Sequence, residues 1–128
     1  MHHEMQSRNL DKNPDDVRNF TNGKVETANV GGSVIGRMTL EPGWKWSKDV
    51  KPIVNTNSCQ MAHTSYGISG RLRVRMDDGT EQEFGPGEVS YVPPGHDAWV
   101  VGNEPFVAVD FTGMKEYAAS TASGTSKK

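Results

Sequence analysis

Apart from His2 and His3 near the N-terminus, the histidines are His63 and His96, and the only thiol is Cys59; these three side chains are the candidates to bind a metal ion or act as a nucleophile. A thiolate with two imidazoles suits zinc, iron, copper or nickel. On a continuous strand, Cys59 and His63 would lie ~13 Å apart, too far to share a metal that bonds its ligands at ~2.0–2.3 Å. They can share one only if the chain turns or bulges at residues 60–62. Spacing alone therefore favours a simpler interpretation, a buried free cysteine with two ordinary histidines.

A nucleophilic cysteine–histidine pair is the competing chemistry. It needs the same turn at residues 60–62, and the only obvious candidate to orient an imidazole is Asp97. Because neighbouring residues of a strand point to opposite faces, Asp97 faces away from His96, and we expect no His–Asp relay. We also expect no phosphate-binding loop, since Gly31 and Gly32 do not follow a strand-to-helix pattern.

Short β-type runs separated by Gly and Pro dominate the middle of the chain, and no segment sustains a helical period. The predicted strands are Val25–Val30, Ser33–Glu41, Cys59–Ser69, Arg71–Met76, Thr80–Phe84, Val89–Val92, His96–Val101 and Phe106–Phe111. Regularly spaced short strands with little helix predict an all-β sandwich or barrel. The chain then divides into a flexible N-terminal arm (1–21), a β-barrel (22–114) and a flexible C-terminal tail (115–128).

The two ends are polar and carry few structural signals. In the arm, Asn13 as a helix cap and Pro14 at the first helical position, followed by Asp15 and Asp16, predict at most one or two helical turns. The tail consists of small and polar residues and is expected to fray. Tyr117 is the tail residue that can dock on the body.

One hairpin can be predicted together with its register. In the run Arg71–Met76, apolar residues alternate with arginines, so the two kinds occupy opposite faces. A three-residue loop, Asp77–Gly79 with its glycine at positive φ, keeps the apolar face free of charge. The resulting pairs are Glu81 opposite Arg75, Glu83 opposite Arg73 and Phe84 opposite Leu72. A two-residue loop would set glutamates against the apolar face, so we expect the longer loop and a solvated arginine face.

The composition is typical of a single domain and does not indicate a polyanionic binding partner. The chain has 128 residues, 34% of them hydrophobic, and a formal net charge of −2. A weakly acidic chain has no electrostatic reason to bind nucleic acid. No apolar run approaches the ~20 residues of a membrane helix, and residues 1–16 have no apolar signal-peptide centre. A single cysteine fits a reducing compartment, so a cytoplasmic protein is expected.

The segment GPGEVSYVPPGHDAW resembles the second motif of the cupin superfamily, a glycine followed after five residues by Pro-any-Gly with a histidine nearby. Gly87 matches the glycine, and Pro93–Gly95 matches the triplet. The preceding HTSYGISGRLRVRMDDG resembles the end of the first cupin motif, in which an acidic ligand stands seven residues before a glycine. Gly70 fits that glycine, and the ligand position falls on His63. The resemblance covers residues 30–112 and implies a double-stranded β-helix (jelly-roll) barrel with its site in the barrel mouth.

The usual cupin set of three histidines and one glutamate is absent. The His-any-His positions of the first motif fall on Asn57 and Cys59, and the second-motif histidine position falls on Ala98, two residues from His96. The chain is therefore similar to a small single-domain bacterial cupin with a degenerate metal-binding motif. The resemblance implies that Cys59, His63 and His96 hold a divalent ion, zinc or iron, with one position open to water or substrate.

A pocket for a small organic ligand is expected beside this metal. Trp44 and Trp46, on one side of an extended segment, wall its mouth, and Asn57, Met61 and Ala98 complete it. Two functions stay open: a metal-dependent enzyme acting on a small molecule, and a non-catalytic binding or sensing module that uses the pocket without a metal. Small cupins often pair through an edge strand, so a homodimer is expected.

Overall fold

The computed structural model describes residues 4–114 and residue 117 of the chain. The strands are β1 (Asp16–Phe20), β2 (Gly23–Val30), β3 (Ser33–Leu40), β4 (His63–Ser69), β5 (Arg71–Met76), β6 (Glu81–Phe84), β7 (Val89–Val92), β8 (His96–Val101) and β9 (Phe106–Asp110). Two short helices, α1 (Trp46–Asp49) and α2 (Lys51–Val54), follow β3. The predicted all-β class is confirmed. Among the described residues, no helix is both long enough and apolar enough to cross a membrane.

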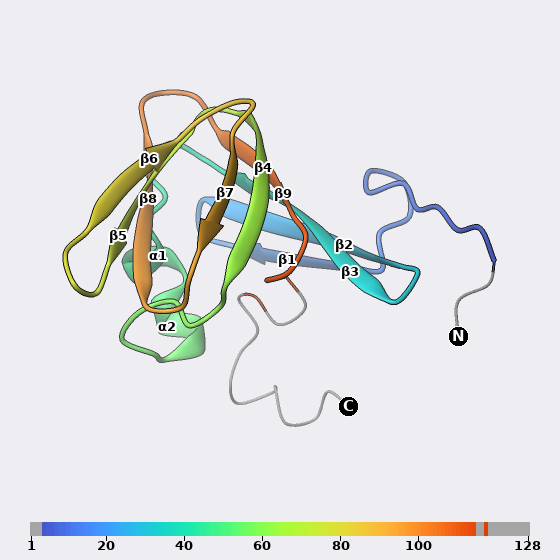
Figure 1. Cartoon of the computed structure of the whole chain (residues 1–128), viewed down its shortest axis with the longest axis horizontal. Coiled ribbons are helices and arrows are strands. Elements are labelled where there is room, and N and C mark those ends of the chain that lie inside the picture. The colour runs from blue at the N-terminus through green and yellow to red at the C-terminus, as the bar shows by residue number, and fades with distance from the viewer. Residues whose placement is uncertain (1–3, 115–116, 118–128) are drawn as a thin grey trace.

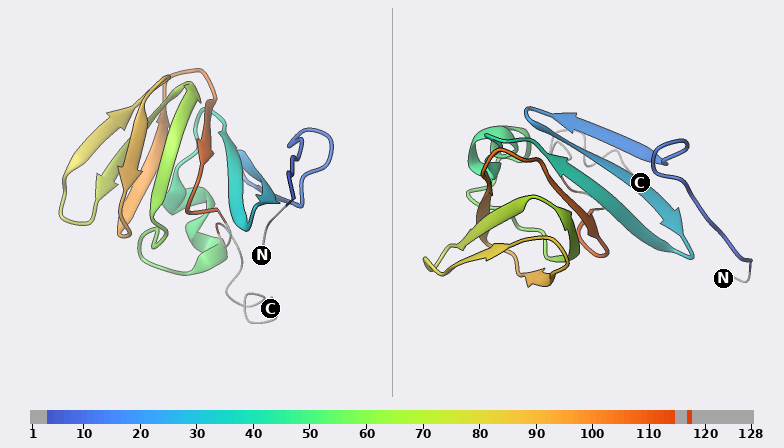
Figure 2. Two further views of the ribbon diagram at one scale, coloured as in Figure 1. Left: turned by 45° about the vertical axis from the view of Figure 1, so that its right-hand side comes forward. Right: turned by 90° about the horizontal axis from the view of Figure 1, so that it is seen from above.

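The strands form two antiparallel sheets around a shared core (Figure 1, Figure 2). One sheet has the order β1-β2-β3-β9-β4-β7 and the other the order β6-β5-β8. Along β8 and β9, buried residues alternate with partly exposed ones, because successive side chains of a strand point to opposite faces. Core residues from the two sheets include Val25, Leu40, Val74 and Phe106. Helix α1 packs beside β8 at one end of this core.

The hairpin β5–β6 has the predicted register. The pairs are Leu72 with Phe84, Arg73 with Glu83 and Arg75 with Glu81. Gly79 has a φ of 94°, a left-handed conformation that a glycine adopts without steric cost. The predicted solvated arginine face is also present, because Arg71 and Arg73 lie largely at the surface and form ion pairs with glutamates of β6.

The N-terminal segment differs from the prediction of a flexible arm that begins a helix. Residues 16–20 form β1, which pairs with β2. The backbone N–H of Asp15 donates to the carbonyl of Thr27 at 2.8 Å, and the Asp15 carboxylate accepts from the N–H of Asn29 at 2.6 Å. These bonds hold Asp15 against β2. Strand pairing in this segment therefore outweighs the local helix-start signal of Asn13 and Pro14.

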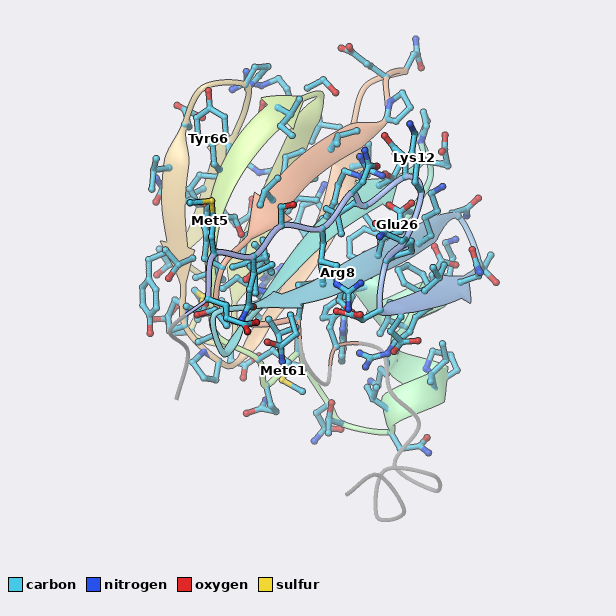
Figure 3. All side chains as sticks on the ribbon, turned by 90° about the vertical axis from the view of Figure 1, so that its right-hand side faces the viewer. Met5, Arg8, Lys12, Glu26, Met61 and Tyr66 are labelled. Atoms are coloured by element: carbon cyan, nitrogen blue, oxygen red, sulfur yellow. The ribbon has the colours of Figure 1, made fainter. Side chains whose placement is uncertain are left out.

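Residues 4–15 lie along the outside of the six-stranded sheet. Figure 3 shows the segment with Met5, Arg8 and Lys12 crossing the sheet next to Glu26. Asp11 receives a bond from the Arg37 guanidinium at 2.6 Å, and the same guanidinium bonds Glu26 at 3.1 Å. Tertiary contacts of this kind hold a segment that is too polar to fold by itself. The proposed division of the chain into arm, barrel and tail stays a prediction, except that the arm contributes a strand.

The other predicted strands agree with the structure to within two residues at each end, with one exception. The run predicted as a single strand, Cys59–Ser69, is interrupted, and β4 begins only at His63. The segment around Trp44 also differs, because it is extended only as far as Lys45 and turns into helix α1 at Trp46. The interruption before β4 and the turn into α1 both shape the candidate site.

Candidate metal centre

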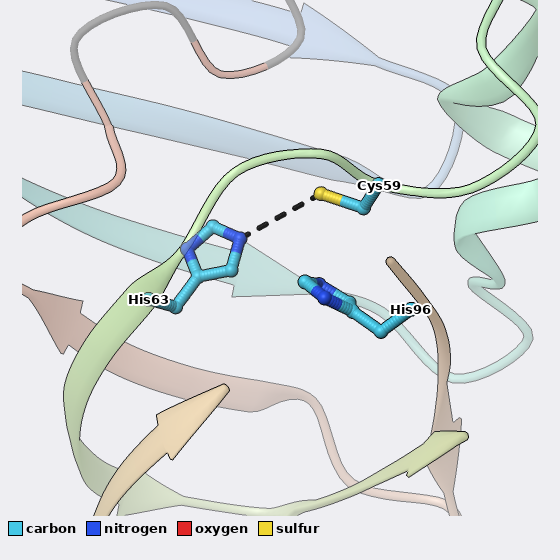
Figure 4. Close-up of side chains that lie close together, drawn as sticks. All are labelled: Cys59, His63 and His96. Atoms are coloured by element: carbon cyan, nitrogen blue, oxygen red, sulfur yellow. Dashed lines mark hydrogen bonds between the residues drawn. The ribbon is translucent and has the colours of Figure 1, made fainter. Parts of the chain in front are cut away.

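The turn that a shared metal requires is present between Cys59 and His63. Cys59 forms an isolated antiparallel bridge with His96, in which its N–H donates to the His96 carbonyl at 2.7 Å. The chain then crosses from this three-stranded sheet to the six-stranded sheet, which it joins at His63 in β4. Figure 4 shows the outcome: the Cys59 Sγ and the His63 Nε2 are 3.7 Å apart, and His96 lies beside them. One ligand atom from each of the three residues lies within 4.8 Å of the others.

Both imidazoles are fixed through Nδ1. His63 Nδ1 contacts the Asp110 carboxylate at 2.5 Å, and His96 Nδ1 lies 2.8 Å from the carbonyl of Pro93. A carbonyl oxygen only accepts, so His96 donates from Nδ1, and in its neutral form it keeps the Nε2 lone pair free. A metal-ligating histidine typically donates its second N–H to a carboxylate or a carbonyl in this way. The arrangement matches two Nε2 ligands to one ion.

Asp110 is the site residue that the sequence analysis missed. It is fully buried at the end of β9. Besides His63, its carboxylate accepts bonds from the Ser65 hydroxyl at 3.2 Å and from the N–H groups of Thr112 and Gly113 at 2.8 and 2.7 Å. The sequence does contain a signal for Asp110. This residue lies four positions after Phe106, on the same inward face of an apolar strand, where an unpaired charge costs free energy.

Gly113 leaves the space that His63 occupies. A Cβ at this position would collide with the carbonyl of Ala62 and would lie 2.6 Å from His63 Nδ1. The glycine is therefore needed for the close approach of the chain to the His63–Asp110 pair, and not for an unusual φ.

The side chains of Cys59, His63 and Asp110 stabilise one another in their charged forms. Burial raises the pKa of the Cys59 thiol, but hydrogen bonds with His63 and His96 outweigh burial and lower it to about 6. Burial lowers the pKa of His63, whereas the bonds to Asp110 and Cys59 raise it to about 9. Burial raises the pKa of Asp110, yet its contact with His63 holds it below the ordinary value. Without a metal, the site therefore favours a thiolate beside an imidazolium at neutral pH.

An apolar cavity adjoins the two imidazoles. The space between its walls and in its opening to solvent together amounts to about 510 Å³. The lining residues are Met38, Leu40, Trp44, Trp46, His63, Ser65, Leu72, Val74, Phe84, Ser90, Val92, His96, Ala98, Phe106 and Tyr117. Of the predicted pocket residues, Trp44, Trp46 and Ala98 are in this lining. Asn57 is exposed and Met61 lies outside the lining, because the chain between α2 and β4 passes beside the cavity.

Tyr117 closes one side of the cavity. Its ring is buried and makes edge contacts with His63, at 5.6 Å between centroids, and with Phe20, at 6.2 Å. The Arg18 guanidinium donates to the Tyr117 carbonyl at 2.7 Å. Burial raises the pKa of the phenol well above 10, and the nearby charges of Cys59 and Asp110 add to this effect. Tyr117 thus docks on the body as expected; the rest of the predicted tail, 115–116 and 118–128, lies outside the described residues.

The fold is similar to those of several solved proteins at low sequence identity. A DUF1255 protein of unknown function from Acidithiobacillus ferrooxidans is 17% identical, with a TM-score of 0.58 over 85% of this chain and 94% of that one. The polyketide cyclase RemF from Streptomyces resistomycificus is 16% identical, with a TM-score of 0.59 over 88% and 81%. The oxalate decarboxylase of Bacillus subtilis, which has Mn(II) centres, is 24% identical, with a TM-score of 0.50 over 93% and 32%.

No known protein-family model matches the chain, and neither does any curated protein sequence. The structural similarities establish the cupin-like β-barrel fold that the two sequence motifs predicted. Because one fold of this kind carries many unrelated functions, the function has to be argued from the site itself.

Proposed function

We propose that the chain binds one divalent metal ion through Cys59 Sγ, His63 Nε2 and His96 Nε2, and a small organic molecule in the adjoining cavity. The observation that carries this proposal is the pairing of both Nδ1 atoms, with Asp110 and with Pro93, which leaves the Nε2 atoms to bind a metal in a group whose candidate ligand atoms lie within 4.8 Å of one another. A thiolate with two imidazoles suits zinc or iron. Zinc and iron are also the metals that the cupin resemblance implies.

Such a centre has the features of a site that binds substrate as well as metal. Three protein ligands leave at least one coordination position open, and His63 and His96 both line the cavity. A divalent ion with one thiolate and two neutral imidazoles keeps one positive charge, which can polarise an oxygen atom of a bound molecule. The oxalate decarboxylase with a similar fold has Mn(II) centres, and RemF is a cyclase, so this architecture accommodates metals and small organic substrates.

A thiol-based function is the second candidate. Cys59, His63 and Asp110 stand in the order of a nucleophile, a base and a group that orients the base. Two observations weigh against it. Cys59 is 3% exposed and is not part of the cavity lining. A nucleophile pair also gives no role to His96, whose ring stands 5.4 Å from that of His63.

Elemental analysis of untagged protein tests the proposal. We expect close to one zinc or iron ion per chain, and we expect Cys59→Ser and His63→Ala to lose it. The matched control is a chain with His2→Ala and His3→Ala, which removes the two histidines outside the proposed centre and should keep the metal. Fresh protein without metal that takes up neither zinc nor ferrous iron would refute the metal centre. Metal-free protein that still binds small molecules would instead support a non-catalytic binding or sensing module.

A further inference from the structure

Two serines face each other across strands β4 and β7. Ser65 of β4 pairs with Ser90 of β7 in the antiparallel register, and the two strands lie side by side in Figure 1. Residues directly opposite each other on neighbouring strands point to the same face of the sheet, with their Cβ atoms about 4.5–5.5 Å apart. That face is the inward one, because Ser65 bonds the buried Asp110 and both serines line the cavity. The two hydroxyl groups therefore lie together on one wall of the cavity.

The two hydroxyls differ in what they offer to a ligand. Ser65 donates its one proton to Asp110 Oδ2 at 3.2 Å, so its oxygen can only accept a further hydrogen bond. Among the described residues, no group bonds the Ser90 hydroxyl. Ser90 is partly exposed, and the Trp44 indole nitrogen is the one buried side-chain nitrogen or oxygen without a partner among those residues, so the unpaired Ser90 oxygen is open to the cavity. The pair thus presents one acceptor, Ser65, and one hydroxyl free to donate, Ser90.

The lining around this serine pair is mostly apolar. Apart from the two serines, the two imidazoles and Tyr117, every lining residue is aliphatic, aromatic or methionine. An apolar molecule gains free energy by leaving water for such a cavity, whereas a polar group on that molecule needs a hydrogen-bond partner inside. The serine pair can provide this partner for a molecule whose body lies against the apolar lining.

The directions of the hydrogen bonds select the polar group. A hydroxyl group fits the pair, because it donates to the Ser65 oxygen and accepts from the Ser90 hydroxyl. A carbonyl or carboxylate oxygen has no proton to donate to Ser65. An ammonium group brings three donors to two serine oxygens, and a buried donor without a partner costs free energy. This selection rests on donors and acceptors and does not depend on the charges of Cys59, His63 and Asp110.

We propose that the cavity binds an alcohol or a phenol with an apolar body, whose hydroxyl group bridges Ser65 and Ser90. The Cα atoms of His63 and Ser65 are ~7 Å apart along β4, so the serine pair adjoins the proposed metal centre without belonging to it. This inference deepens the proposed function and rests on it for the binding of a small organic molecule in the cavity. The two hydrogen bonds to the serines do not require the metal.

Phenol and toluene test the hydroxyl group, because they have nearly the same shape and toluene carries a methyl group where phenol carries its hydroxyl. Their dissociation constants are measured by NMR titration of the wild type, Ser90→Ala and Ser69→Ala. Ser69→Ala is the matched control, since Ser69 is also a partly exposed strand serine but is not part of the cavity lining. We expect the preference for phenol over toluene to drop about fivefold in Ser90→Ala and to stay unchanged in Ser69→Ala.

The wild-type protein provides a second readout that does not depend on the variants folding. Nuclear Overhauser effects should connect the ring protons of phenol with the Hβ protons of Ser65 and Ser90. An unchanged preference in Ser90→Ala, the lack of these effects, or failure of both compounds to bind at millimolar concentration would overturn the inference. Benzylamine, an ammonium ion at neutral pH, would also overturn it by binding more tightly than phenol in a manner that depends on Ser90.

Metal analysis of the same samples separates this inference from the proposed metal centre. Ser90→Ala should keep the metal, because Ser90 is not one of the three proposed ligands. A Ser90-dependent preference for phenol in protein that binds no metal refutes only the metal centre. Metal-loaded protein whose preference does not depend on Ser90 refutes only the hydroxyl site.

Discussion

Replacing Asp110 with asparagine tests how the fold presents His63 to a metal. In the wild type, Asp110 Oδ2 contacts His63 Nδ1, while Oδ1 accepts the N–H groups of Thr112 and Gly113 at 2.8 and 2.7 Å. The asparagine carbonyl would keep the two backbone bonds, which places its NH₂ group against His63 Nδ1. Two donors cannot face each other, so the His63 proton moves to Nε2 and the lone pair that would bind the metal is lost.

The expected size of this effect follows from the role of the Asp110 carboxylate, which forms a hydrogen bond with the proposed metal ligand His63. Loss of such a partner weakens metal binding about 10- to 100-fold, which corresponds to ~1.4–2.7 kcal/mol. We therefore expect the dissociation constant for zinc to rise by this factor in a competition titration against a chromophoric chelator. Asp49→Asn is the matched control. Asp49 is also a buried carboxylate, but it bonds Lys48 at 2.8 Å in α1 and makes no contact with the metal centre.

Two results would contradict this reasoning. If Asp110→Asn bound zinc as tightly as wild type, then Asp110 would not set the tautomer of His63. If Asp49→Asn weakened zinc binding as much as Asp110→Asn does, the loss would reflect general destabilisation. Far-UV circular dichroism of both variants shows whether each keeps its β-structure during the titration.

Three further predictions concern the same site. At neutral pH, zinc should release close to one proton per ion, because Cys59, with a pKa of about 6, has already lost its proton, whereas His63, with a pKa of about 9, still carries the proton that zinc must displace. Zinc affinity should therefore rise with pH between these values and fall more steeply below 6, as a titration in weakly buffered dye solution measures. Gly113→Ala should weaken zinc binding by displacing His63, whereas Gly79→Ala, at a φ of 94° with open space around it, should only lower the free energy of unfolding in urea, by about 1–2 kcal/mol. Ala98→Leu should weaken the binding of small organic molecules in an NMR titration and leave the metal content unchanged, since Ala98 lines the cavity and is not one of the three proposed metal ligands.

Sequence patterns within a short segment predicted those parts of the fold that depend on residues close together in the chain. In β5–β6, the alternation of arginine with apolar residues and a glycine at positive φ leave one register that keeps charge off the core, and that register is observed. The cap signal at Asn13 failed because it is equally local, while the pairing of β1 with β2 is a tertiary interaction that a short helix cannot outweigh. The predicted homodimer stays a prediction.

The site could be predicted only in part, because its geometry depends on contacts between distant segments. The bridge between Cys59 and His96 spans 37 positions and decides that the chain turns before His63. Asp110 reaches His63 from β9, 47 positions away, and no motif quoted from the sequence includes it. The pocket position assigned to Asn57 came from motif spacing, which the loop after α2 does not preserve.

X-ray absorption spectroscopy at the edge of the metal that copurifies with the chain tests the central claim most directly. We expect a first shell with one sulfur at about 2.3 Å and two imidazole nitrogens at about 2.0–2.1 Å, completed by oxygen or nitrogen from solvent or a ligand. Cys59→Ser should remove the sulfur scatterer. A first shell of nitrogen and oxygen alone in the wild-type protein, or protein that binds no metal, would refute a metal centre formed by Cys59, His63 and His96.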